Sequence, residues 1–174
     1  MAEWISVYGR RVAELSTAAM QRELEAADLW TQAEALGLPD DEADAAVESA
    51  LHHLRIELAA DGGAFEVHWK PEGRPIRVKS VTGPEAREQV TEALEEFLPP
   101  ATEPGPARIR DHLHQAQQVV NLEMSAEDAQ HLGAALGGLL ALSFAESNDG
   151  LVWFFDRDWV SPEDPAATIW TPDE

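Results

Sequence analysis

The chain has 174 residues, with 33 acidic residues against 12 basic ones, a formal net charge of −21, and no cysteine. The absence of cysteine excludes disulfides, thiolate metal ligands and cysteine nucleophiles. The negative charge disfavours binding to nucleic acid and to anionic lipid, and it favours a basic macromolecule as a partner.

Neither end of the chain nor its interior carries a pattern typical of a membrane protein. The first eleven residues contain no apolar core of a signal peptide. The longest apolar run, 132–145, is interrupted by three glycines and is too short to span a bilayer. We therefore expect a cytoplasmic protein that makes no membrane contact.

The first third of the chain is predicted to be mainly helical after a short strand at 5–8. Ser16 is the expected N-cap of a helix that begins with strong helix formers. A second helix at 29–36 is expected to stop at Gly37, and a third opens at Asp40, where acidic side chains favour a helix N-terminus.

The hydrophobic period then changes from that of a helix to that of a strand. Alternating apolar and polar residues predict three antiparallel strands at 55–60, 64–70 and 76–82, joined by glycine-containing turns. Trp69 is expected on the buried face of this meander. An acidic helix is predicted at 84–98, with a proline in its first turn.

Residues 99–106 contain four prolines and one glycine, and they predict a stiff connector between an N-terminal part, 1–98, and a C-terminal part, 107–174. The C-terminal part is expected to contain, in order, a helix at 107–118, a strand at 119–124, a core helix at 126–146, a strand at 151–155 and an irregular tail. We expect these strands to join or pack on the first sheet. The predicted fold is one α+β domain, with an antiparallel sheet packed against helices.

No catalytic motif or dense set of metal ligands stands out in the sequence. Glu127 and His131 have the i,i+4 spacing of two ligands on one helix face, but the sequence supplies no third ligand beside them. We therefore predict no metal, no cofactor and no enzymatic activity.

The placement of charge is more informative than any motif. Residues 111–174 hold 12 acids and one base, whereas four of the 12 bases lie within 70–79. Aromatic side chains near the C-terminus lie among these acids, a combination typical of protein interfaces. The predicted partner-binding residues are Asp156, Asp158, Trp159, Glu163, Asp164 and Trp170. The alternative for the two tryptophans is that they anchor the tail to the domain.

Two classes of function are compatible with these observations. The first is an acidic binding module, most concretely an inhibitor or immunity-type protein that occludes a basic toxin or nuclease. The second is an enzyme or small-ligand-binding protein whose site is assembled from residues distant in sequence, with the candidates Glu57, Glu66, His68, Glu127 and His131. A structural subunit of a larger assembly is a further alternative, and the sequence leaves the oligomeric state open.

Overall fold

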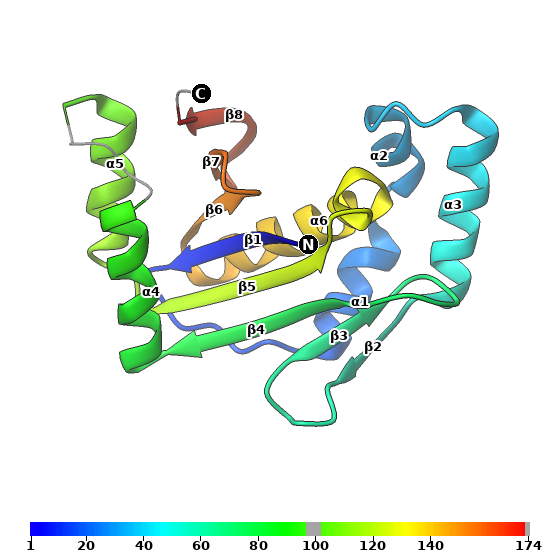
Figure 1. The fold of residues 1–174 in the computed structure, drawn as a ribbon, viewed down its shortest axis with the longest axis horizontal. Helices are drawn as coiled ribbons and strands as arrows, with labels where there is room; N and C mark the ends of the chain where they lie inside the picture. The colour runs from blue at the N-terminus through cyan, green and yellow to red at the C-terminus, as the bar shows by residue number, and fades with distance from the viewer. Residues whose placement is uncertain (97–101, 173–174) are drawn as a thin grey trace. The chain divides into compact units, whose positions relative to one another are not determined.

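The structure is a computed structural model that describes residues 1–96 and 102–172 (Figure 1). In chain order the elements are β1 (Ala2–Gly9), α1 (Thr17–Ala26), α2 (Leu29–Ala35), α3 (Asp40–His53), β2 (Arg55–Leu58), β3 (Phe65–His68), β4 (Ile76–Thr82), α4 (Gly83–Glu96), α5 (Pro104–Leu113), β5 (Gln118–Ser125), the 3₁₀ turn η1 (Asp128–Gln130), α6 (Leu132–Asn148), β6 (Gly150–Phe154), β7 (Asp158–Ser161) and β8 (Asp164–Trp170).

Within the described residues, the strands form one eight-stranded sheet in the order β2-β3-β4-β5-β1-β6-β7-β8. The pairs β1–β6, β2–β3, β3–β4, β6–β7 and β7–β8 are antiparallel. The expected fold class, α+β with an antiparallel sheet and helices, is therefore confirmed. The meander over 55–82 is also confirmed, with Val67 opposite Ile56 on one side and Ile76 on the other.

The chain divides into two compact units, and each unit draws on residues from both sides of the proline-rich segment. Unit 1 comprises 1–3, 15–79 and 122–140, and unit 2 comprises 4–14, 80–121 and 141–174. Four of the five unit boundaries fall within β1, β4, β5 and α6, and the fifth lies between β1 and α1.

Unit 1 contains the helical first third of the chain and the meander. Ser16 caps α1 as predicted, since its side chain accepts a hydrogen bond from the Ala19 N–H at 3.3 Å. Helix α2 ends at Ala35 with Leu36 as its C-cap, and Gly37 follows with a φ of +75°, the left-handed conformation that glycine adopts readily. Leu51 and Leu58 are exposed, although the spacing of apolar residues along α3 and β2 is typical of a buried face at these positions. Leu58 is the last residue of β2, which is an edge strand.

Unit 2 has a core of aromatic and aliphatic side chains from strands and from α4 and α5, which lie side by side (Figure 1). The buried members of this core are Tyr8, Val81, Ala86, Val90, Ala93, Ile109, Leu113, Val119, Leu151, Trp153 and Trp159. Residues 97 and 98, the last two of the acidic helix predicted over 84–98, lie outside the described residues.

The connector predicted over 99–106 is partly wrong. Its first three residues lie outside the described part of the chain, but Pro104 opens α5, which runs to Leu113 rather than over the predicted 107–118. Proline is compatible with the first turn of a helix because its missing N–H has no intrahelical partner there. The dense prolines therefore mark a helix start as well as a break.

The core helix was predicted over 126–146, but α6 begins only at Leu132. Residues 126–131 instead form a turn with η1, in which the Ser125 Oγ accepts a hydrogen bond from the Asp128 N–H at 3.1 Å. The role predicted for the helix is confirmed, because Leu136, Leu140 and Ala145 are fully buried.

The tail predicted to be irregular contains two strands, β7 and β8. The turn between β6 and β7 places Phe155 and Asp156 at φ of +49° and +57°, and phenylalanine is not a residue that predicts such a turn. Strand β8 contains Pro165, which a strand tolerates at the edge of a sheet, where β8 lies.

Candidate functional site

Four of the six predicted partner-binding residues are acids on or next to β7 and β8 in unit 2. Asp156, Glu163 and Asp164 are exposed, and Asp158 is half-buried. The Asp158 carboxylate accepts a hydrogen bond from the Thr171 hydroxyl at 2.6 Å. These acids meet the first requirement of an electrostatic docking surface, which is access to solvent.

Trp159 does not belong to that surface, and its prediction as an exposed interface residue is wrong. Its side chain is 0% exposed. It stacks on Trp153 at a centroid distance of 5.4 Å and an interplanar angle of 5°, and it packs against Tyr8, also at 5.4 Å. The three rings join β1, β6 and β7 in the core of unit 2, so the alternative reading of Trp159 as an anchor is the correct one.

Trp170 has features of both an interface residue and an anchor of the tail. It is half-buried, it pairs with Trp159 across the β7–β8 ladder, and it packs against the core of unit 2. Its buried part holds β8 in place, and the remainder reaches solvent beside the acids of this region.

A cavity of about 520 Å³ in unit 2 adjoins the acidic residues, and it brings together side chains that are far apart in the sequence. Its lining includes Ser161 at the end of β7, and Pro162 and Glu163 from the turn that leads into β8. The other lining residues are Arg10, Pro104, Ala107, Arg108, Asp111, His112, Gln115, Asp149, Gly150 and Leu151.

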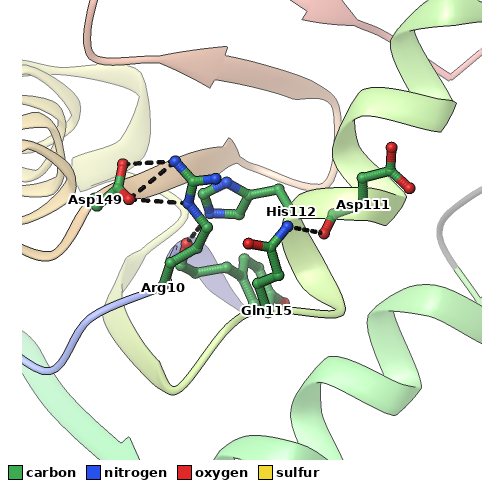
Figure 2. Close-up of polar contacts among 6 residues, drawn as sticks. Arg10, Asp111, His112, Gln115 and Asp149 are labelled. Atoms are coloured by element: carbon green, nitrogen blue, oxygen red, sulfur yellow. Dashed lines mark hydrogen bonds and ion pairs between the residues drawn. The ribbon is translucent and has the colours of Figure 1, made fainter.

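Arg10 and Asp149 form the main ion pair of this cavity, and Figure 2 shows their side chains pointing toward one another. The Arg10 Nε and Nη2 donate to the two Asp149 carboxylate oxygens at 2.9 and 3.0 Å. The hydrogen bonds from Arg10 hold the pKa of the Asp149 carboxyl below its ordinary value. The same contact raises the pKa of the Arg10 guanidinium. Each charge is thus compensated by the other.

His112 lies beside this pair on α5 and is buried (Figure 2). Its Nε2 lies 2.7 Å from the Tyr8 carbonyl oxygen, so Nε2 carries the proton and donates it to that acceptor. Burial lowers the pKa of the imidazole, and the nearby Arg10 and Arg108 act in the same direction. His112 therefore contributes no positive charge to the cavity near neutral pH, and the exposed charges that remain are Arg108, Asp111 and Glu163.

The residues of the alternative, ligand-binding hypothesis fall into two groups within unit 1. His68 lies between two carboxylates, with its Nε2 at 3.2 Å from Glu57 Oε1 and 3.6 Å from Glu66 Oε2. Glu127 and His131 do not share a helix face, because His131 has an extended backbone at the end of η1. Both nevertheless line one cavity.

Sequence reasoning did not find Arg10, His112 or Asp149. Arg10 and Asp149 are separated by 139 residues, so no local spacing connects them. The one available signal is the sequence Asn148-Asp149-Gly150, which is typical of a helix end, and Asp149 adopts a φ of +53° there. That signal predicts the turn and says nothing about the partner of the carboxylate.

Among residues 1–96 and 102–172, no group of three or more histidine, cysteine, aspartate or glutamate side chains is arranged to hold a metal ion. Within the same residues, no helix is long and apolar enough to cross a membrane. Comparison with protein-family models, curated proteins and solved structures finds no match to this chain.

Proposed function

We propose that the protein is a binding module for a basic protein partner, and that it docks through the exposed acids at the start of β8 and in the turns on either side of β7 in unit 2. In its most concrete form it is an inhibitor or immunity-type protein that covers the functional surface of a basic toxin or nuclease. It would act by occlusion and would need no chemistry of its own.

The observation that carries the proposal is the exposure of Asp156, Glu163 and Asp164, which belong to a stretch of the sequence with very low basic content. Residues 111–174 contain a single base, Arg157, against 12 acids. Charges of one sign on a protein surface accelerate encounter with an oppositely charged partner and disfavour like-charged competitors. Trp159 of β7 is fully buried, so this strand is anchored to the core of unit 2 before a partner binds. A surface that is ordered beforehand loses less entropy on association.

The experiment is affinity capture from a lysate of the native host, with the wild-type protein and two variants of equal net charge. The first variant carries Asp156→Asn, Glu163→Gln and Asp164→Asn. The matched control carries Glu23→Gln, Glu34→Gln and Glu48→Gln, which neutralise three exposed acids of unit 1. Thermal melts of both variants establish that they fold.

The expected result is a basic protein that the wild type and the control retain and that the first variant loses. The association rate with that partner should fall at least about tenfold between 50 and 500 mM salt, because the Debye length shortens from roughly 14 to 4 Å. Equal retention by both variants, or an association rate independent of salt, would show that the acids of β7 and β8 do not steer the partner.

A further inference from the structure

Unit 1 contains a second cavity, of about 550 Å³, that the docking proposal does not use. This volume falls in the range of small-molecule binding sites. One wall is a single face of α3, where Glu42, Ala46 and Ser49 follow one another at helical spacing. The other walls of the cavity are formed by residues 69–72, which follow β3, and by the turn that precedes α6.

The body of this cavity is apolar. Its lining includes Trp69, Leu132 and Pro71 together with Leu38 and Ala46. Trp69 and Leu132 are buried, at 6% and 1% exposed, so they form fixed surfaces. A ligand that fills this space needs an apolar part of its own, because polar groups placed here would lose their hydration.

The charged groups of the lining leave an excess of negative charge. Lys70 is the one lysine or arginine among the lining residues. The Lys70 ammonium forms an ion pair with the buried Asp128 carboxylate, so the positive charge of Lys70 is already compensated. Three further carboxylates line the cavity, those of Glu42, Glu72 and Glu127, and all three side chains are exposed. The uncompensated charge at the cavity is therefore that of the three glutamates.

Trp69 also offers an aromatic face to a cation. The Lys70 Nζ lies 4.9 Å from the centroid of the Trp69 ring, within the range of a cation–π contact. This wall of the cavity is therefore compatible with a cationic group.

We propose that this cavity binds a small organic cation, an amine, amidine or guanidine carried on an apolar body. The apolar body would lie against Trp69 and Leu132, and the cationic group would face Glu72 and Glu127. This site is independent of the acids of β7 and β8, so it stands or falls separately from the proposed docking function. The cation can come from a free metabolite or from an arginine or lysine side chain of a polypeptide.

The test titrates benzamidine into the ¹⁵N-labelled full-length protein and follows the six tryptophan indole N–H signals. Benzamide is the matched neutral ligand of nearly the same shape. The expected result is a saturable shift of the Trp69 signal, assigned with Trp69→Phe, at a Kd of about 0.1–1 mM, as expected for a ligand of this size. The signals of the exposed Trp4 and Trp30 should remain in place. Benzamide lacks the positive charge of benzamidine, so it should bind at least about tenfold more weakly.

Two pairs of variants locate the site. Ala46→Phe fills the cavity and should abolish the shift, whereas Ala45→Phe places the same ring on the exposed side of α3 and should leave the Kd unchanged. Glu72→Gln with Glu127→Gln should weaken benzamidine about tenfold or more, and Glu23→Gln with Glu34→Gln should not.

The capped peptide acetyl-Gly-Arg-Gly-amide distinguishes the two sources. A Kd below that of benzamidine identifies a polypeptide side chain as the natural cation, and a Kd above it identifies a free small cation. The proposal is overturned by the absence of a saturable Trp69 shift or by equal affinities for benzamidine and benzamide. It is also overturned if the control variants lose as much affinity for benzamidine as the variants of the cavity. Each variant is first checked for a wild-type melting temperature.

Discussion

Arg10 and Asp149 join the first and third chain segments of unit 2 through a bidentate ion pair, although 139 residues separate them in the sequence. Arg10 follows the last residue of β1, and Asp149 lies between α6 and β6, next to Gly150, the partner of Gly9 in the β1–β6 ladder. Backbone hydrogen bonds from the N–H groups of residues 10 and 11 to Asp149 O and Asn148 O, at 3.2 and 2.9 Å, continue this contact beyond the strands. The ion pair therefore lies directly beyond the last residue pair of the β1–β6 ladder.

The Arg10–Asp149 pair should contribute modestly to stability because both side chains are about two-fifths exposed, at 39% and 44%. A double-mutant cycle with Arg10→Gln and Asp149→Asn should give a coupling energy of about 0.2–1 kcal/mol in denaturant melts. Asparagine is suitable at 149 because it tolerates the positive φ there. A coupling energy of zero would mean that the two hydrogen bonds between Arg10 and Asp149 only replace the hydrogen bonds that these side chains make to water, with no net gain in stability.

The same pair predicts a pH dependence with a defined sign. Arg10 lowers the pKa of Asp149 in the folded protein, so the unfolded chain takes up the proton first as the pH falls. The contribution is present above the unfolded value, near 3.8, and is lost as the pH falls through the folded value. Arg10→Gln should therefore make the free energy of unfolding less steep in the acid limb of its pH profile. An unchanged acid limb would contradict this linkage.

His112 predicts a second pH effect, at higher pH. Burial lowers its pKa below the ordinary 6.5, so in the window between the folded value and 6.5 the unfolded chain binds more protons. Stability should rise with pH through this window and should be complete above 6.5. His112→Gln, which keeps a side-chain donor for the Tyr8 carbonyl, should reduce that slope, and the matched His114→Gln at an exposed site should not. A ¹⁵N spectrum of the imidazole should show the Nε2–H tautomer at neutral pH.

Trp159→Ala should destabilise the fold strongly, since it removes a fully buried ring that packs against Trp153 and Tyr8. The expected loss is about 3–5 kcal/mol in the free energy of unfolding. The control is Trp4→Ala in the same unit, where the ring is 42% exposed and the loss should stay near or below about 1 kcal/mol. Equal losses in the two variants would mean that the aromatic stack does not support β7.

Elements with strong local signals could be predicted from the sequence. The period of apolar residues placed the helices of unit 1 and the meander, and Ser16 and Gly37 marked helix ends with the chemistry that those ends require. Trp69 was expected on the buried face of the meander and is buried. In these segments the neighbouring residues along the chain determine the structure.

Where distant residues determine the structure, prediction from the sequence failed. Strand β8 contains an aspartate, a proline and two alanines, and its pairing with β7 decides that it is a strand. Trp159 lies between acids in the sequence, but the alternation of β7 turns it toward Tyr8 and Trp153 and away from those acids. The cavity of unit 2 combines residues 10, 112 and 149, and no spacing rule relates them.

The contact between α5 and β8 depends on Gly105, a residue inside the segment that was predicted to be a connector. A Cβ placed on Gly105 would lie 2.7 Å from the Ile169 carbonyl oxygen and 3.1 Å from the Trp170 Cβ. The first of these neighbours is backbone, which cannot rotate away as a long side chain can. Glycine at this position therefore permits α5 to approach β8 closely.

Gly105→Ala should consequently destabilise the protein by roughly 1–3 kcal/mol, the range of overpacked contacts. The sign of this change in stability is informative, because a glycine-to-alanine change within a helix otherwise stabilises the protein by about 0.5–1 kcal/mol. Gly63→Ala is the matched control, since the nearest atom to its Cβ is Asp61 Oδ1 at 3.5 Å, and its effect should stay within about 0.5 kcal/mol. Amide hydrogen exchange should locate the damage in β8, with faster exchange at Thr168 and Trp170 and little change in the meander of unit 1. A stabilised Gly105→Ala variant with β8 still protected would show that α5 and β8 do not pack this closely in solution.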